Sequence, residues 1–332
     1  MHPQFLNLLC CPETGGSLRL ETKRIGPKGM VMEGELVSAF GRRYPIVRGI
    51  PRFVGSERYA ASFGFEWSRW PRVQFEAENA GRSMEGHTTH MWESITQVGG
   101  TLQGRTTAEF GCGSGRFLDI VRRKGGRAVG MDLSMAVETA RRSFADDPEV
   151  LVVQGDLFKP PFRSGVFDGG YTIGVLHHTP DPLGGVQALS RTVHAGGWVA
   201  CSVYPRQGFY SFRSVALHRE LNSRLKLLLG YWPALAYAYL SGYLIAPAFG
   251  AAHRVRGLRG VVRLLEENVL PSLPDLPDAR WRVLDIFDAI TPAIASTHTG
   301  DEVRNWLLQA GCKDVRSTSW GDTSVIGIRT SS

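Results

Sequence analysis

The chain has 332 residues and a formal net charge of +7, and 43% of its residues are hydrophobic and 21% charged. This composition excludes a disordered chain and predicts one large domain, or one medium domain with a small one. The basic residues are spread along the chain without a Lys/Arg tail, so charge alone does not predict nucleic-acid or membrane binding.

The cysteines and the N-terminal residues bear on the cellular compartment. Five cysteines without a regular spacing predict free thiols in a reducing environment. The first residues, MHPQFLNLLCC, lack a basic segment followed by a long apolar one, so no signal peptide is predicted. We therefore expect a cytoplasmic protein.

Residues 1–54 predict a small β-rich module, because short β-like runs alternate with turns rich in Gly and Pro. The stretch LLCCPETGG begins like a zinc-binding knuckle. A structural zinc site needs four ligands, usually two C-x-x-C pairs, but the position paired with Cys11 is Thr14 and ELVSAFG lacks the second pair. CCPETGGSL and YPIVRGIPRF resemble the Trm112-like family, so we predict a zinc-free descendant of it, with no metal.

Residues 55–104 predict an N-terminal helical cap, and residues 105–205 predict the core of the protein. In this core, short apolar runs that end in Gly or Asp alternate with segments of helical period. The runs are TTAEFG, RAVGMD, VLVVQGD, VFDGGYTIGV and GGWVACSVY. This alternation predicts an α/β fold with a doubly wound, Rossmann-like, mostly parallel sheet.

Residues 206–285 interrupt the alternation and predict a helical, apolar insertion. Within it, residues 227–252 contain no charged side chain and are long enough to span a bilayer, but two prolines and several glycines interrupt them. We favour a pair of helices that form a lid over the substrate entrance. A peripheral patch on anionic lipid and a membrane-spanning helix stay open as alternatives.

Residues 286–332 predict the completion of the core. The segment GDEVRNWLLQAG has the pattern of an amphipathic helix, and we expect Thr299 to cap its N-terminus. The following segment, KDVRSTSWGDTSVIGIR, predicts a hairpin of two last strands.

The turn after the first core strand, EFGCGSGRF, predicts a cofactor site. Gly111, Gly113 and Gly115 allow a sharp turn and let a ligand lie against the backbone. A dinucleotide fingerprint needs a small residue at its sixth position, but Arg116 occupies it here. Glu109 precedes the glycines, and its carboxylate suits an ammonium group better than phosphates.

Two aspartates follow the next two strands. Asp132 could accept hydrogen bonds from ribose hydroxyls and Asp156 could meet an adenine amino group, although either could instead cap a helix. With Glu109, these carboxylates describe a nucleoside with an amino-acid tail and no phosphate. That ligand is S-adenosylmethionine (SAM).

The ordered motifs EFGCGSGRF, GMDLS, VQGDLFKPPFRSGVFDGGYTIGVLHHTPDP and LSRTVHAGGWVACSVY resemble those of class I SAM-dependent methyltransferases, of the methyltransferase domain 11/25 type, over residues 105–204. The resemblance implies a seven-stranded sheet with one antiparallel strand. It assigns these residues to the cofactor: Glu109, Gly111, Cys112, Gly113, Gly115, Asp132, Leu133, Asp156, Leu157 and Ile173.

The acceptor side has fewer candidates. His177 and His178, after the fourth core strand, could remove a proton from the acceptor, or could merely pack the loop. Tyr204 and His298 are weaker substrate candidates, and Cys112 has no histidine that would make it a nucleophile.

We therefore expect methyl transfer to a small-molecule or lipid-like acceptor, such as a quinone, polyketide, glycolipid or decorated sugar, in a biosynthetic pathway. Two alternatives stay open. An rRNA or tRNA methyltransferase is one, since some RNA-modifying relatives carry zinc-ribbon-like modules, although no RNA-binding motif supports it. The other is a SAM-binding cyclase or scaffold that transfers no methyl group. The oligomeric state is not predicted.

Overall fold

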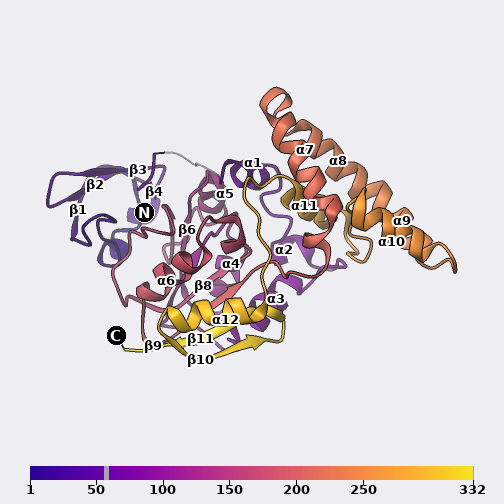
Figure 1. The fold of residues 1–332 in the computed structure, drawn as a ribbon. Helices are drawn as coiled ribbons and strands as arrows, with labels where there is room; N and C mark the ends of the chain where they lie inside the picture. The colour runs from indigo at the N-terminus through magenta and orange to yellow at the C-terminus, as the bar shows by residue number, and fades with distance from the viewer. Residues whose placement is uncertain (56–59, 332) are drawn as a thin grey trace.

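The computed structural model describes residues 1–55 and 60–331, which contain a large and a small β-sheet with helices around them (Figure 1). The large sheet has seven strands in the order β10-β11-β9-β8-β5-β6-β7. Its strands are β5 (Thr106–Phe110), β6 (Arg127–Asp132), β7 (Val150–Gln154), β8 (Phe167–Ile173), β9 (Val193–Ser202), β10 (Cys312–Thr318) and β11 (Gly321–Arg329). Strand β11 runs antiparallel to both its neighbours, and β5 to β9 are parallel. The predicted α/β, Rossmann-like, mostly parallel sheet is confirmed.

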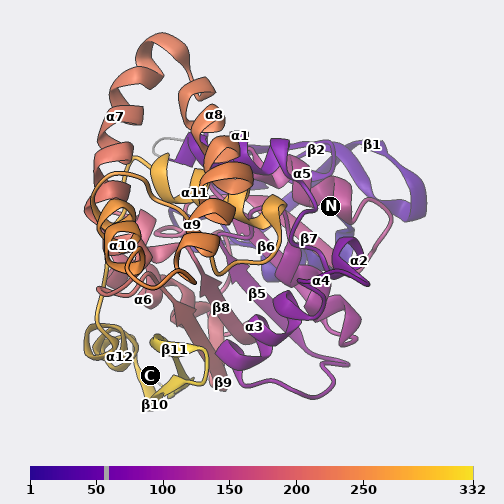
Figure 2. The ribbon, with the colours of Figure 1, turned by 90° about the vertical axis from the view of Figure 1, so that its right-hand side faces the viewer.

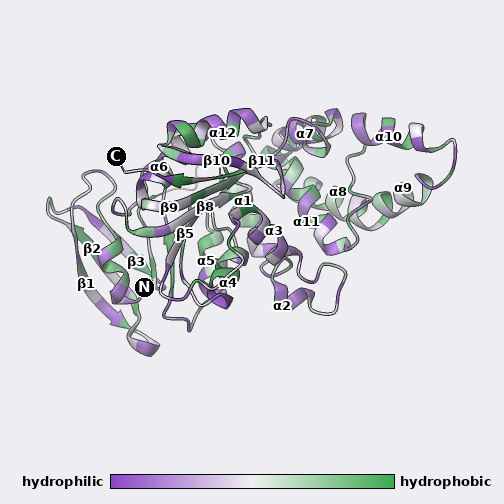
Figure 3. Ribbon diagram, turned by 90° about the horizontal axis from the view of Figure 1, so that it is seen from below, coloured by the Kyte–Doolittle hydropathy of each residue, from purple (hydrophilic) through white to green (hydrophobic). Residues whose placement is uncertain are grey.

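Helices cover both faces of this sheet, as its apolar strands require. One face carries α3 (His87–Thr96), α4 (Arg116–Arg123) and α5 (Ala136–Ser143), and the other carries α6 (Pro182–Thr192) and α12 (Gly300–Gln309) (Figure 3). The expected cap of α12 is present as a capping box, in which Thr299 accepts from the Glu302 N–H and Glu302 accepts from the Thr299 N–H.

The small sheet consists of four antiparallel strands near the N-terminus, as the β-rich composition of that segment predicts. Its strands are β1 (Leu18–Ile25), β2 (Val31–Ser38), β3 (Arg43–Val47) and β4 (Ile50–Pro51), after a 3-10 helix over Pro3–Leu8. The Phe53 N–H donates to the carbonyl of Gln154 at 2.8 Å, so the module is joined to the edge strand β7. Phe5 and Leu9 share one apolar core with Phe110 of β5.

The prediction that the N-terminal module binds no zinc is not tested by the positions of its side chains. The Cys11 sulfur lies 3.1 Å from the Tyr44 hydroxyl oxygen, inside the module. In residues 1–55 and 60–331, no group of three or more His, Cys, Asp or Glu side chains is placed to hold a metal ion. The assignment to a zinc-free Trm112-like module stays a prediction.

The insertion is helical, as predicted, and most of it projects as an arm on the side of the molecule opposite the small sheet (Figures 1 and 2). The arm contains α7 (Arg213–Leu229), α8 (Trp232–Leu240), a π-helical turn (Ser241–Ile245), α9 (Ala246–Ala252) and α10 (Arg259–Asn268). Within the described residues, one continuous helix, Trp232–Ala252, is long and apolar enough to cross a membrane, and 33% of its most apolar window is buried.

Two helices connect the arm to the sheet. Helix α11 (Ala279–Ile290) packs on α7 and α8 of the arm and on α1 (Ala61–Arg69), which also contacts α5; the short α2 (Glu76–Asn79) precedes α3. The predicted boundary at residue 285 falls inside α11, and the predicted domain limits stay predictions.

Candidate active site

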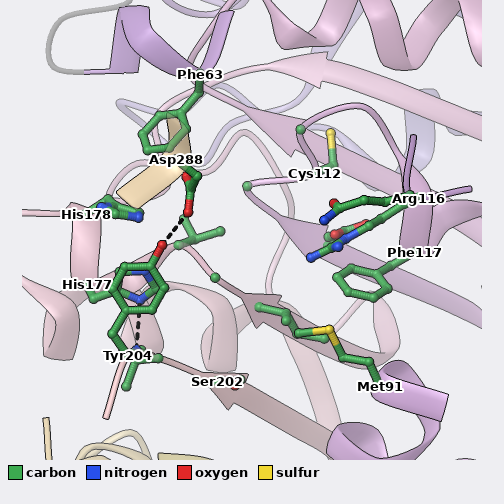
Figure 4. A pocket seen from close by; sticks show the side chains of 18 of the residues that line it. Phe63, Met91, Cys112, Arg116, Phe117, His177, His178, Ser202, Tyr204 and Asp288 are labelled. Carbon is green, nitrogen blue, oxygen red and sulfur yellow. Dashed lines mark hydrogen bonds between the residues drawn. The ribbon is translucent and has the colours of Figure 1, made fainter. Parts of the chain in front are cut away.

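A cavity of about 460 Å³ lies at the carboxyl ends of the parallel strands, where open α/β sheets bind ligands. Two groups of residues line it. The first follows β5, β6, β7 and β8, and the second comes from α1, α11 and the segment after β9. Figure 4 shows Cys112, Arg116 and Phe117 on one side of this space and His177, His178, Tyr204 and Asp288 on the other.

The glycine turn between β5 and α4 forms part of the first group. Gly111, Gly113 and Gly115 have φ angles of +82°, +51° and +91°, which side chains with a Cβ rarely adopt. A Cβ on Gly113 would also lie 2.8 Å from the indole nitrogen of Trp67. The turn therefore presents bare backbone to the cavity.

Two predicted carboxylates border this turn. Glu109 is 2% exposed and accepts a hydrogen bond from the Tyr171 hydroxyl at 3.3 Å, and burial raises its pKa well above the usual value. Asp132 accepts from the Gly113 N–H at 2.9 Å and from the N–H and hydroxyl of Ser134 at 2.8 and 2.7 Å. Asp132 thus joins the glycine turn to Ser134 and lines the cavity. It does not cap helix α5, whose N-cap residue is Met135, and its contact with a ribose stays a prediction.

The remaining cofactor candidates divide into two sets. Cys112, Leu133, Leu157 and Ile173 line the cavity, whereas Gly115 and Asp156 are not among its lining residues. The Asp156 side chain accepts from the Phe158 N–H at 3.0 Å. Burial raises the pKa of the Cys112 thiol well above its usual value, so this side chain stays protonated and is a poor nucleophile.

The two histidines lie in the 3-10 turn Leu176–His178 after β8, and both line the cavity. His178 Nδ1 lies 2.8 Å from the Ile294 carbonyl oxygen. Because a carbonyl only accepts, Nδ1 carries the proton and Nε2 keeps a lone pair. His178 is 3% exposed, and its Nε2 has no hydrogen-bond partner among the described residues. Burial lowers the pKa of His178, so its imidazole is neutral near pH 7.

His177 takes the opposite tautomer. Its Nδ1 accepts from the Tyr204 N–H at 3.3 Å, so Nε2 carries the proton. Its ring stacks on Tyr204 with the centroids 3.6 Å apart. Of the two histidines, only His178 therefore offers a free basic nitrogen to the cavity.

The two weaker substrate candidates lie in different places. Tyr204 lines the cavity, donates its hydroxyl proton to Asp288 and stacks on Tyr210 at 3.5 Å between centroids (Figure 4). His298 is not among the lining residues; its Nε2 lies 2.8 Å from the Ser296 hydroxyl and its backbone N–H donates to the Tyr204 carbonyl. A substrate role for His298 stays a prediction.

Sequence reasoning did not assign five charged residues that line the cavity: Glu66 of α1, Arg116 of α4, Asp285 and Asp288 of α11, and Asp322 of β11. The guanidinium of Arg116 packs over the Phe117 ring at 4.4 Å. A signal for the aspartates of α11 was present, because a D-x-x-D spacing on a helix places both side chains on one face. Glu66 stands in the aromatic segment FGFEW, where a buried carboxylate is unusual.

Comparison with known proteins supports the identity of the core. Residues 108–201 match the family model for a methyltransferase domain. The chain is 35% identical over 109 residues to a ubiquinone biosynthesis O-methyltransferase of Paracidovorax citrulli, covering 32% of this chain and 46% of the relative. It is 30% identical over 132 residues to a tRNA U34 carboxymethyltransferase of Alcanivorax borkumensis, covering 39% and 41%. The chain thus spans less than half the length of these curated relatives.

Some solved structures align with more of the chain, but at lower sequence identity. A structure of the complex that contains the Haloferax volcanii Trm112 methyltransferase activator covers 81% of this chain and 98% of its own, at 15% identity and a TM-score of 0.45. A structural similarity at this TM-score supports no functional argument. The family match and the order of the sheet instead support the conclusion that residues 108–201 form a methyltransferase domain of the class I type.

Proposed function

We propose that the protein is a SAM-dependent methyltransferase that acts on a small-molecule or lipid-like acceptor. One observation carries the proposal: a carboxylate-bordered glycine turn and a histidine with a free basic nitrogen face the same cavity. The names of the relatives that act in ubiquinone biosynthesis support a biosynthetic role.

The residues at the strand ends fit SAM by their chemistry. Glu109 would accept from its ammonium group, the bare turn would contact its amino-acid tail, and Asp132 would accept from the ribose hydroxyls. Leu133, Leu157 and Ile173 would enclose the adenine. Among the described residues that line the cavity, Arg116 is the only Lys or Arg, so the lining suits a ligand with positive charge better than a dinucleotide with two phosphates.

When bound, SAM supplies a methyl group on a sulfonium whose sulfur keeps the electron pair of the broken bond. The protein aligns the acceptor with that methyl carbon and excludes water, which lowers the barrier by several kcal/mol. The acceptor atom forms the new bond to carbon, and its proton passes to His178 Nε2. The Ile294 carbonyl holds the ring by its Nδ1–H and favours the imidazolium that forms.

The first test measures cofactor binding without methyl transfer. Isothermal titration with S-adenosylhomocysteine (SAH) should show a 1:1 complex that Asp132→Ala weakens at least tenfold, because the carboxylate is lost. Asp119→Ala, at a surface ion pair on α4, is the control. No SAH binding by the unaltered protein would contradict the proposal.

The second test incubates the protein with methyl-labelled SAM and fractionated cell extract. Label in small molecules or in lipid extract is expected. Label in rRNA or tRNA would instead identify an RNA methyltransferase, and SAH binding without label in any fraction would identify a SAM-binding protein that transfers no methyl group.

A further inference from the structure

The half of the cavity that faces away from the glycine turn has more acidic than basic side chains. Glu66 comes from α1, and Asp285 and Asp288 come from α11. None of these three carboxylates lies within 4.0 Å of a Lys, Arg or His nitrogen of residues 1–55 or 60–331. Arg116 interacts electrostatically with all three carboxylates and also with Glu109, and Arg219 interacts with Asp288, so the acidic side chains outnumber the basic ones here.

Glu66 is the residue whose state points to a missing partner. It is 1% exposed, and neither carboxylate oxygen has a hydrogen-bond partner in the part of the chain that the structure describes. Leaving a buried polar group unpaired costs about 1–3 kcal/mol. Burial, Asp288 and Asp285 raise the pKa of Glu66 well above its usual value, while Arg116 opposes them. A ligand that donates a charged hydrogen bond here would remove this cost.

The two aspartates are only partly satisfied. Asp285 accepts one long hydrogen bond, from the Gln74 amide at 3.4 Å, and Asp288 accepts one from the Tyr204 hydroxyl. Burial and the neighbouring Asp288 raise the pKa of Asp285 to about 7. Each carboxylate therefore has acceptor capacity left for a donor inside the cavity.

Aromatic rings complete this half of the cavity. Phe63, Tyr204, Tyr210 and Trp281 line the cavity, and Trp67 lines it where the indole packs against Gly113 of the glycine turn. Aromatic faces attract organic cations, and carboxylates pair with ammonium groups. An anionic acceptor would be repelled here, and a neutral acceptor would bring no positive charge to the three carboxylates.

We propose that the acceptor is a small molecule with a protonated amine, anchored between Glu66 and the Asp285–Asp288 pair and enclosed by these rings. The inference rests on the proposed function, since it assumes that the acceptor binds in this half of the cavity. The amine anchors the molecule and places its nucleophile near the methyl carbon and His178.

The decisive experiment separates a small-molecule extract of the source organism into cationic, neutral and anionic pools. Each pool is incubated with the protein and methyl-labelled SAM. We expect at least tenfold more labelled product from the cationic pool than from the others. Label mainly from the neutral or anionic pool would overturn the amine proposal and leave methyl transfer intact, whereas no label from any pool, lipid or RNA fraction would refute methyl transfer itself.

Variants connect the result to the three carboxylates. Glu66→Gln and Asp285→Asn keep side-chain shape but remove charge, and each should lower labelling of a dilute cationic pool at least tenfold. SAH affinity should change less than threefold. Glu220→Gln, at an exposed ion pair on α7, is the matched control. Unchanged labelling in both cavity variants would overturn the proposal.

A binding measurement needs no knowledge of the acceptor. Benzylamine should raise the melting temperature of the SAH-saturated protein at pH 7.5, while benzyl alcohol at the same concentration should not, because a ligand stabilises the state that it binds. In Glu66→Gln the two compounds should act alike. Equal shifts by both compounds in the unaltered protein would contradict an amine site.

Discussion

The role of His178 can be tested with a substitution that preserves its structural contact. Its Nδ1–H donates to the Ile294 carbonyl at 2.8 Å, while Nε2 has no partner among the described residues. In His178→Asn, the amide nitrogen can replace Nδ1 as the donor, but nothing replaces the basic Nε2. The substitution therefore removes the base and keeps the loop.

The size of the effect follows from the chemistry of a positioned base. General bases contribute about 10²- to 10⁴-fold to the rate, so turnover of His178→Asn at saturating SAM should fall about 100-fold or more. SAH affinity should change less than threefold, because the residues proposed to hold the cofactor are unchanged. His194→Asn, at an exposed histidine of β9, is the control.

The pH dependence provides a second readout. Burial lowers the pKa of His178, Asp288 opposes this shift, and Arg219 adds to it. The base is thus already free at pH 7, and turnover at saturating SAM and acceptor should decline on the acid side of pH 6.5. His178→Asn should lose this acid limb. Unchanged turnover, or a parallel loss of SAH affinity, would refute the role of His178 as the base.

Four further predictions concern other parts of the molecule. Gly113→Ala should weaken SAH binding about tenfold, since the positive φ and the contact with Trp67 together cost about 1–2 kcal/mol. The control is Gly15→Ala, where φ is also positive but no atom lies within 4 Å of the added Cβ; its SAH affinity in the same titration should be unchanged. Glu66→Gln should raise the free energy of unfolding by about 1–3 kcal/mol at pH 8 and little at pH 5. The reason is that the raised pKa of Glu66 in the folded state makes the unaltered protein lose stability as pH rises above 4.5. An equal difference in melting temperature between variant and unaltered protein at both pH values would contradict this. If the lipid-patch alternative holds, the protein should float with anionic vesicles and Leu228→Glu should prevent this, since Leu228 is 84% exposed at the end of α7. No flotation of the unaltered protein would exclude that alternative. Elemental analysis should find no stoichiometric zinc.

The fold was predictable because its signals are local. Each core strand is a short run such as VLVVQ, all of which is buried in the structure, and three of the five runs end at a Gly or Asp that turns the chain. The glycine turn also needed no tertiary information, since an acidic residue and three spaced glycines predict a backbone surface open to a ligand. Glu109, Asp132, Gly111 and Gly113 line the cavity, whereas Gly115 does not.

The acceptor side was not predictable in the same way. Glu66 and Asp285 are more than 200 residues apart in the chain, and only the packing of α1 against α11 brings their helices together. The roles of the two histidines likewise depend on the Ile294 carbonyl and the Tyr204 N–H, which set opposite tautomers.

The apolar segment 227–252 shows the same limit. Its composition predicted helices but did not distinguish a lid over the substrate entrance from an arm on the surface. In the structure none of its residues lines the cavity. The sequence by itself thus determined the sheet, the order of its strands along the chain and the cofactor turn, because hydrophobic period and glycine geometry act over a few residues. Only the tertiary structure decided which charges share the acceptor cavity, because their burial and pairing arise from contacts between distant helices.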